Sequence, residues 1–147
     1  MNENGLRTTS YVYDPLGNVT SVTQTPAPGT APSVTSSFTY QQPFNELTTV
    51  TDPLNHTTKI AYDASGSVQS ITDPLNRVTG EMHNSAGQLT SITNPLGQTT
   101  SYSYDNGLLQ YVTNPSGQTT IYSYNGQTVE VQPPSGGSTD YNYDGFG

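Results

Sequence analysis

The chain has 147 residues, with three Lys or Arg against eleven Asp or Glu, a formal net charge of −8 and no cysteine. This acidic balance argues against nucleic acid and anionic membrane surfaces as partners, because both carry negative charge themselves. The lack of cysteine excludes a disulfide scaffold and a thiolate metal site.

Large aliphatic residues are scarce, yet the spacing of the tyrosines predicts an ordered chain. Only 26 of the 147 residues are Leu, Ile, Val or Phe, and a share below roughly 20% together with high net charge suggests disorder. However, 11 tyrosines recur at regular spacing between stretches rich in Thr and Val, which favour β-strands. No run approaches the roughly 20 apolar residues of a membrane helix, so we expect no membrane insertion.

A repeat of roughly 21 residues runs along the chain, with its clearest copy at residues 60–76. Each copy carries an aromatic-rich strand that leads into Tyr-Asp and a Gly turn. The recurring strand positions define an aromatic ladder: Tyr11, Tyr13, Phe38, Tyr40, Tyr62, Tyr102, Tyr104, Tyr122, Tyr124, Tyr141 and Tyr143. We predict a single array of six to seven repeats over residues 1–147 that begins inside one repeat and ends inside another. Arrays usually build surfaces rather than active sites.

Each repeat is predicted to hold two strands, which gives an antiparallel meander of about thirteen strands and no helix. The tyrosines of one strand are two residues apart, so they share a face. The return strand has apolar residues three apart, as in Val68 and Ile71. A β-bulge in each return strand would bring both onto one face and would curve the sheet. The last copy, with Val129 and Val131 two apart, is predicted to lack the bulge.

Two kinds of turn punctuate each repeat, a hairpin turn after Tyr-Asp and a second turn that begins with Asp-Pro or Asn-Pro. The hairpin turns contain Asp14, Gly17, Asp63, Gly66, Gly87, Asp105, Gly107 and Gly126, and the Pro turns contain Asp52, Pro53, Asp73, Pro74, Asn94, Pro95, Asn114 and Pro115. The Pro turns have type I preferences. A row of carboxylates also suggests acid–base pairs or calcium binding. We favour turn capping, because Asn replaces Asp in several copies and keeps the turn bond without the charge.

One segment interrupts the pattern, the Pro-rich stretch at residues 25–37. We interpret it as an inserted loop, since Pro lacks the donor that a strand ladder needs, and favour a tolerated insertion over a binding role. Two Asn-x-Thr sequons begin at Asn18 and Asn55, and whether either is glycosylated is left open.

No pattern of catalytic or metal-binding residues recurs with the repeat. His56 lies in a turn, and His83 replaces Tyr in the ladder beside Glu81. Neither has the convergent partners that catalysis or metal binding needs. We therefore expect no enzyme activity and no cofactor. For the tyrosines, packing between repeats is favoured over stacking on neutral glycans.

The order Tyr-Asp-x-x-Gly, then Leu/Val-x-x-Ile/Val-Thr-Asp-Pro-Leu-Gly/Asn-x-Thr-Thr, resembles the RHS/YD-repeat family over nearly the whole chain. That family includes RHS polymorphic toxins, shell components of insecticidal toxin complexes and teneurin ectodomains. The resemblance implies a β-sheet ribbon that spirals into a hollow shell, and a secreted or cell-surface setting. The self-cleaving core of the toxin members has no counterpart here, so no protease residue is carried over.

These observations favour a non-catalytic structural segment of an RHS/YD-repeat shell or surface protein, with neighbouring YD repeats as its partners. Two alternatives remain at this point. The first is a self-assembling extracellular filament or adhesive strut that associates end to end through exposed sheet edges. The second is a carbohydrate-binding repeat module.

Overall fold

The computed structural model describes residues 7–143, which form thirteen β-strands and no helix. The strands are β1 (Thr8–Tyr13), β2 (Val19–Thr25), β3 (Val34–Gln41), β4 (Glu46–Thr51), β5 (Thr57–Tyr62), β6 (Val68–Thr72), β7 (Val78–His83), β8 (Leu89–Thr93), β9 (Thr99–Asp105), β10 (Leu108–Thr113), β11 (Thr119–Asn125), β12 (Thr128–Gln132) and β13 (Thr139–Asn142). The predicted all-β antiparallel meander is confirmed. The predicted array covers residues 1–147, and its two ends, at residues 1–6 and 144–147, lie outside the described residues.

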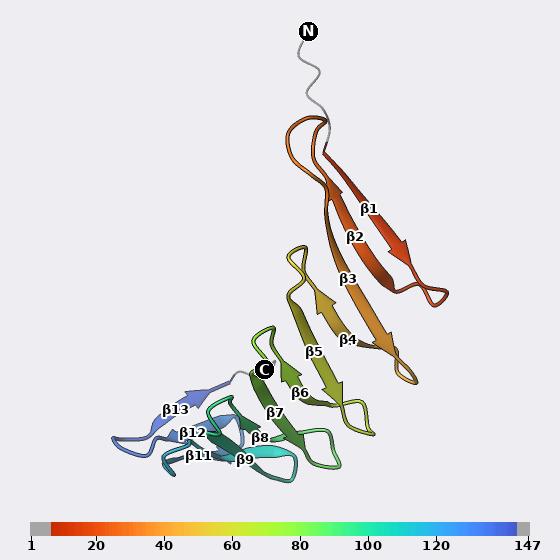
Figure 1. Cartoon of the computed structure of the whole chain (residues 1–147). Coiled ribbons are helices and arrows are strands. Elements are labelled where there is room, and N and C mark those ends of the chain that lie inside the picture. Colours follow the sequence, from red (N-terminus) through yellow and green to blue (C-terminus); the bar gives the residue numbers. More distant parts are fainter. Residues whose placement is uncertain (1–6, 144–147) are drawn as a thin grey trace. The chain divides into compact units, whose positions relative to one another are not determined.

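The chain divides into two compact units, the first ending at Val78 and the second beginning at Thr79. In the first unit, β1 to β6 pair antiparallel in chain order. In the second unit, β7 to β13 do the same (Figure 1). The repeat pattern predicts one array over residues 1–147 and gives no sign of this division. The described residues contain no helix long and apolar enough to cross a membrane.

The return strands carry the predicted bulges. In β6, Ser70 pairs with Ala61 and Val68 pairs with Tyr62, so Gln69 is the extra residue. The same irregularity occurs in β2, β4, β8 and β10. In β12 the register with β11 is continuous, which confirms that the last return strand lacks the bulge. The extra residue therefore accounts for the apolar spacing of three, because it brings both apolar side chains to one face.

No residue among those described is fully buried. The units have no two-layered core, and their stability must come from strand ladders and cross-strand side-chain pairs. Threonine pairs supply one recurrent example at the Pro turns. The hydroxyls of Thr51 and Thr57 lie 2.8 Å apart, and the corresponding pairs Thr93–Thr99 and Thr113–Thr119 lie 2.9 Å apart.

The Pro-rich loop is shorter than the sequence predicts. β2 continues to Thr25 and β3 begins at Val34, so residues 26–33 alone lie outside the strands rather than residues 25–37. The hydroxyls of Thr23 and Thr35 are 2.8 Å apart across the two strands. Thr and Val before Phe38 favour strand structure, and this local preference extends the ladder towards the prolines.

Candidate functional site

The aromatic ladder lies on one face of the strands, which we call the Tyr face. In β9, the side chains of Thr100, Tyr102 and Tyr104 are half-buried, whereas those between them are exposed. Tyr102 lies opposite Val112 and Tyr104 lies opposite Leu109. Each tyrosine therefore has an apolar side chain of its own return strand directly across the ladder, at the close range of cross-strand pairs. This alternation produces an apolar stripe along an otherwise polar sheet.

The second tyrosine of a repeat also binds the preceding repeat through its hydroxyl. Tyr104 donates a hydrogen bond of 2.8 Å to the carbonyl oxygen of Leu89. Three further tyrosines make the same bond at 2.8–3.0 Å, namely Tyr40 to Val19, Tyr62 to Leu47 and Tyr124 to Leu109. In each case the acceptor is the return-strand residue that lies opposite the preceding tyrosine or histidine of the ladder. The hydroxyl thus links successive hairpins.

Strand geometry explains why this carbonyl needs a side-chain donor. The ladder between β8 and β9 has three pairs and stops at Ser91–Ser101, so Leu89 lies beyond its end. The bulge in β8 lies at Thr90, between this ladder and Leu89, and the Tyr104 hydroxyl supplies the contact of Leu89 with β9. For Tyr62, burial and the nearby Glu46 carboxylate raise the pKa of the phenol. It therefore remains protonated, as a donor to Leu47 must be.

Three ladder positions do not make this bond within residues 7–143. The Tyr13 and Tyr143 hydroxyls have no hydrogen-bond acceptor there, and His83 has no hydroxyl to donate. The Tyr143 backbone N–H instead donates to the Gln127 carbonyl at 2.8 Å, because β12 lacks the bulge and its register with β13 continues. The His83 ring lies 4.0 Å from the Glu81 carboxylate, as their shared face predicts.

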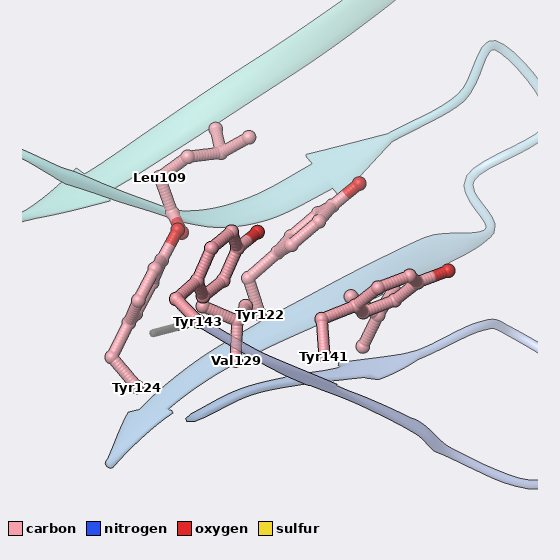
Figure 2. Close-up of a pocket in the computed structure, with 7 residues that line it drawn as sticks. Leu109, Tyr122, Tyr124, Val129, Tyr141 and Tyr143 are labelled. Carbon is pink, nitrogen blue, oxygen red and sulfur yellow. The ribbon is translucent and has the colours of Figure 1, made fainter. Parts of the chain in front are cut away.

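A shallow apolar hollow of about 390 Å³ lies on the Tyr face of the second unit. Figure 2 shows its tyrosine rings, which come from β11 and from the region of β13. Its lining residues are Leu109, Tyr122, Tyr124, Val129, Val131, Tyr141 and Tyr143. None of these residues is charged, and their polar side-chain atoms are phenol hydroxyls. The hollow can bury apolar or aromatic groups, but it offers neither a nucleophile–base pair nor a set of metal ligands.

The sequence suggests two kinds of turn, but the hairpin turns and the Pro turns share one loop geometry. In the turn at residues 73–77, the Asp73 side chain accepts hydrogen bonds of 2.9 Å from the backbone N–H groups of Leu75 and Arg77. The same two bonds, at 2.8–3.0 Å, are made by Asp14, Asp52, Asp63, Asn84, Asn94 and Asn114. Asp and Asn are equivalent here, which fits turn capping.

The fourth loop position has positive φ in all seven of these turns. It is occupied by Gly17, Asn55, Gly66, Asn76, Gly87, Gly97 and Gly117, with φ between 61° and 89°. Pro53, Pro74, Pro95 and Pro115 occupy the second position of the four Pro turns, where Pro is favoured.

The last two hairpins have shorter turns. Asp105 pairs with Leu108 across a two-residue loop in which Asn106 and Gly107 have φ of 48° and 83°. Asn125 pairs with Thr128 across a second such loop, with Gly126 at φ 61°. Asp105 therefore ends a strand and does not hold the capping position predicted for it. The shorter loops and the missing bulge together account for the drop in repeat length from 21 to 19 residues.

Hydrogen bonds in their own turns lower the pKa values of Asp14, Asp52 and Asp73, which predicts a loss of stability in acid. The Arg77 side chain and backbone N–H lower the pKa of Asp73, so this carboxylate stabilises the fold above its unfolded pKa of about 3.9. The contribution is lost as pH falls through the native pKa. We expect Asp73→Asn to keep the turn at pH 7 and to reduce the loss of stability between pH 5 and pH 2.

Asp73→Ala removes both turn bonds and is expected to lower the free energy of unfolding at pH 7, like loss of a helix N-cap. Urea denaturation at several pH values measures both effects. If the parent chain and the Asp73→Asn variant lose the same free energy of unfolding as the pH falls, the Asp73 carboxylate does not contribute to the loss of stability in acid.

The remaining candidate residues do not converge on a site. Residues 7–143 contain no group of three or more His, Asp or Glu side chains placed to hold a metal ion. His56 lies 2.9 Å from Asp52 within its own exposed turn. The sequon residue Asn18 donates its side-chain amide to Asp14 at 2.8 Å and to Asn45 at 2.6 Å, whereas Asn55 is exposed.

The hydroxyl bonds and the common loop are the features that sequence reasoning missed. One signal for the first was present: the second ladder position holds Tyr in six repeats and never Phe, whereas Phe38 occupies the first position. A preference for Tyr over Phe at one position indicates a role for the hydroxyl.

Comparison with known proteins gives one family and one fold. The family model for the teneurin YD-shell matches residues 11–145. No curated protein matches the chain. The crystal structure of TcdB2-TccC3 has a TM-score of 0.63 at 19% identity over 82% of this chain. That of TcdB2-TccC3-Cdc42 has a TM-score of 0.67 at 19% identity over 88%. The aligned part spans 7% and 8% of those chains, respectively.

Proposed function

The chain belongs to the teneurin YD-shell family, and we propose that it serves as a non-catalytic wall segment of a secreted or cell-surface YD-repeat shell. The observation that carries this proposal is the hydroxyl bond between successive hairpins, made at 2.8–3.0 Å by four tyrosines. Such a bond joins a repeat to the one before it at four places, so it serves the continuity of a wall. The hydroxyls are occupied by structural acceptors and are not presented to a substrate.

The single-layered sheet supports the same role. No described residue is fully buried, so each sheet has two accessible faces of different chemistry. The Tyr face carries the apolar stripe, and the opposite face is rich in Ser and Thr. A wall needs one face towards an interior and another towards solvent. Because this chain spans 7–8% of the similar solved chains, enclosing a volume would require many more repeats.

The proposal can be tested by cysteine labelling. The labelled protein should have the form in which its source organism produces it. The chain has no cysteine, so single variants report one position each. Thr100→Cys lies on the Tyr face and Ser103→Cys on the opposite face of β9. A bulky maleimide is expected to modify one of them readily and the other slowly. The isolated 147-residue chain gives the reference rate for each position. The protection factor is the rate in the isolated chain divided by the rate in the protein from the source organism. Equal protection factors at both positions would contradict a wall and favour an open strut.

A further inference from the structure

One tyrosine lies on the face opposite the Tyr face, at a position where other repeats carry small hydroxyl side chains. In β10, Tyr111 follows the bulge residue Gln110 and lies opposite Ser103 of β9. The same position in the other bulged return strands is occupied by Ser21, Thr49, Ser70 and Ser91. Tyr111 is 38% exposed, although β9, β10 and β11 each have a neighbour on both edges. Its exposure is therefore that of an internal strand and not that of a sheet edge.

Two further apolar side chains lie on the same face. Ile121 of β11 lies directly opposite Tyr111, and Leu108 at the start of β10 is 49% exposed. In the preceding repeats, the position of Ile121 is occupied by Ser10, Ser37, Lys59, Gly80 and Ser101. A cross-strand pair of Tyr and Ile stabilises a sheet, but this role does not require that apolar surface stays exposed. Leu108, Tyr111 and Ile121 form an apolar patch, the Tyr111 patch, on a face that is otherwise polar in β8 to β12.

A hollow of about 310 Å³ adjoins the Tyr111 patch and supplies polar groups. Leu108 lines it together with Asp105, Gln110 and Ser123, and with the two tyrosines that flank Ser123 in β11. Asp105 lies opposite Leu108, so the carboxylate shares the face of the patch. Diagonal neighbours such as Asp105 and Tyr111 are roughly 7–8 Å apart in a regular sheet. This separation leaves room for a flat group between the carboxylate and the ring.

The charge of the second unit determines which ligands this surface favours. Residues 79–147 contain no Lys or Arg, and their acidic residues are Glu81, Asp105, Glu130, Asp140 and Asp144. Asp105 and Glu130 lie on the face of the patch, where the unit has no Lys or Arg to pair with them. An anionic ligand or a second copy of this acidic chain would bring like charge to the patch, which opposes association. The complementary occupant is therefore a cation that also covers apolar surface.

We propose that the Tyr111 patch and its hollow bind an arginine-bearing segment of a partner protein, with a guanidinium group between the Tyr111 ring and the Asp105 carboxylate. A guanidinium stacks on an aromatic ring and donates paired hydrogen bonds to a carboxylate. The aliphatic stem of Arg covers apolar surface such as Leu108. Lys binds as a point charge and lacks the planar group. The inference goes beyond the wall function and does not depend on it, because it uses one face of one unit.

Titration of the full chain, labelled with ¹⁵N, with the synthetic peptide acetyl-Ser-Arg-Ser-Arg-Ser-amide tests the proposal. We expect saturable shift changes at the amides of residues 103–111 and 121–123, with a dissociation constant at or below about 1 mM. The same peptide with Lys in place of Arg is expected to bind more weakly, because an ammonium group cannot stack and pair in the same way. The peptide with Glu in place of Arg is expected to leave these amides unchanged.

Three variants separate the patch from the net charge of the unit. Tyr111→Ser gives β10 the residue type of β6 and β8 and is expected to weaken binding of the Arg peptide about fivefold. Asp105→Asn gives β9 the residue type of the equivalent Asn125 and is expected to weaken binding about twofold to fivefold. Glu81→Gln is the matched control, since it removes the same charge from the Tyr face, and is expected to leave binding unchanged.

The proposal is overturned if the Arg peptide leaves these amides unperturbed up to its solubility limit, or if folded Tyr111→Ser binds it as tightly as the parent chain. Equal binding by the Asp105→Asn and Glu81→Gln variants also overturns it, because net charge alone would then attract the peptide. This comparison decides the matter if Tyr111→Ser does not fold, since Asp105 is exposed. Self-association of the parent chain in analytical ultracentrifugation that is lost in Tyr111→Ser would identify a second copy as the occupant and would overturn the proposal as well.

Discussion

Removal of the Tyr104 hydroxyl in Tyr104→Phe is expected to lower the free energy of unfolding by about 1 kcal/mol. The lost bond of 2.8 Å is of ordinary strength, but the Leu89 carbonyl lies beyond the end of its strand ladder and has no replacement donor in the sheet. Tyr104→Ala also removes the ring from its position opposite Leu109. Because that ring is half-buried, we expect a total loss of about 2–3 kcal/mol, below the 3–5 of a core aromatic.

The neighbouring Tyr122 provides the matched control. It lies on the same face and lines the apolar hollow, yet its hydroxyl has no hydrogen-bond partner within residues 7–143. Tyr122→Phe is therefore expected to change stability by less than about 0.5 kcal/mol. Urea denaturation of each variant measures the loss, and amide exchange shows whether it is confined to β8 and β9. Equal effects of Phe at both positions would rule out a specific role for the hydroxyl bond.

Much of this fold could be predicted because the geometry of each repeat depends on residues that are close together in the sequence. Alternation in β9 indicates which residues share the Tyr face, and the spacing of Val68 and Ile71 indicates a bulge. These are short-range constraints within one hairpin, and the observed register agrees with them. The absence of a bulge in β12 could be predicted for the same reason, from two valines whose spacing is two.

The hydroxyl bonds escaped prediction because they join different hairpins. The Tyr62 hydroxyl reaches Leu47, 15 residues earlier, and no local pattern specifies an acceptor at that distance. The common loop was missed for a different reason. Pro53 and Ala64 occupy the same loop position in turns that look different in sequence, although both are organised by the preceding Asp side chain. In the sequence, the Pro distinguishes one kind of turn from the other. In the structure, the carboxylate before it determines the geometry of the loop.

The bulge residue controls whether a tyrosine can bind the preceding hairpin, and deletion of Gln110 tests this control. Without Gln110, Leu109 and Val112 are two positions apart, so β10 can adopt the continuous register of β12. The Leu109 carbonyl then lies within the ladder to β11, and the Tyr124 hydroxyl loses its acceptor. We expect the chain to remain folded but to lose about 1–2 kcal/mol in free energy of unfolding.

The converse change is a stronger test, because it should create a bond that the native chain lacks. Insertion of one Thr after Val129 would give β12 the spacing of β10, with Val129 and Val131 three positions apart. The β12–β13 ladder would then end before Val129, and the Tyr143 hydroxyl could donate to the Val129 carbonyl. If the bulge governs this contact, Tyr143→Phe costs about 1 kcal/mol in the insertion variant and almost nothing in the native chain. An insertion variant in which Tyr143→Phe is still neutral would show that the bulge alone does not place the hydroxyl.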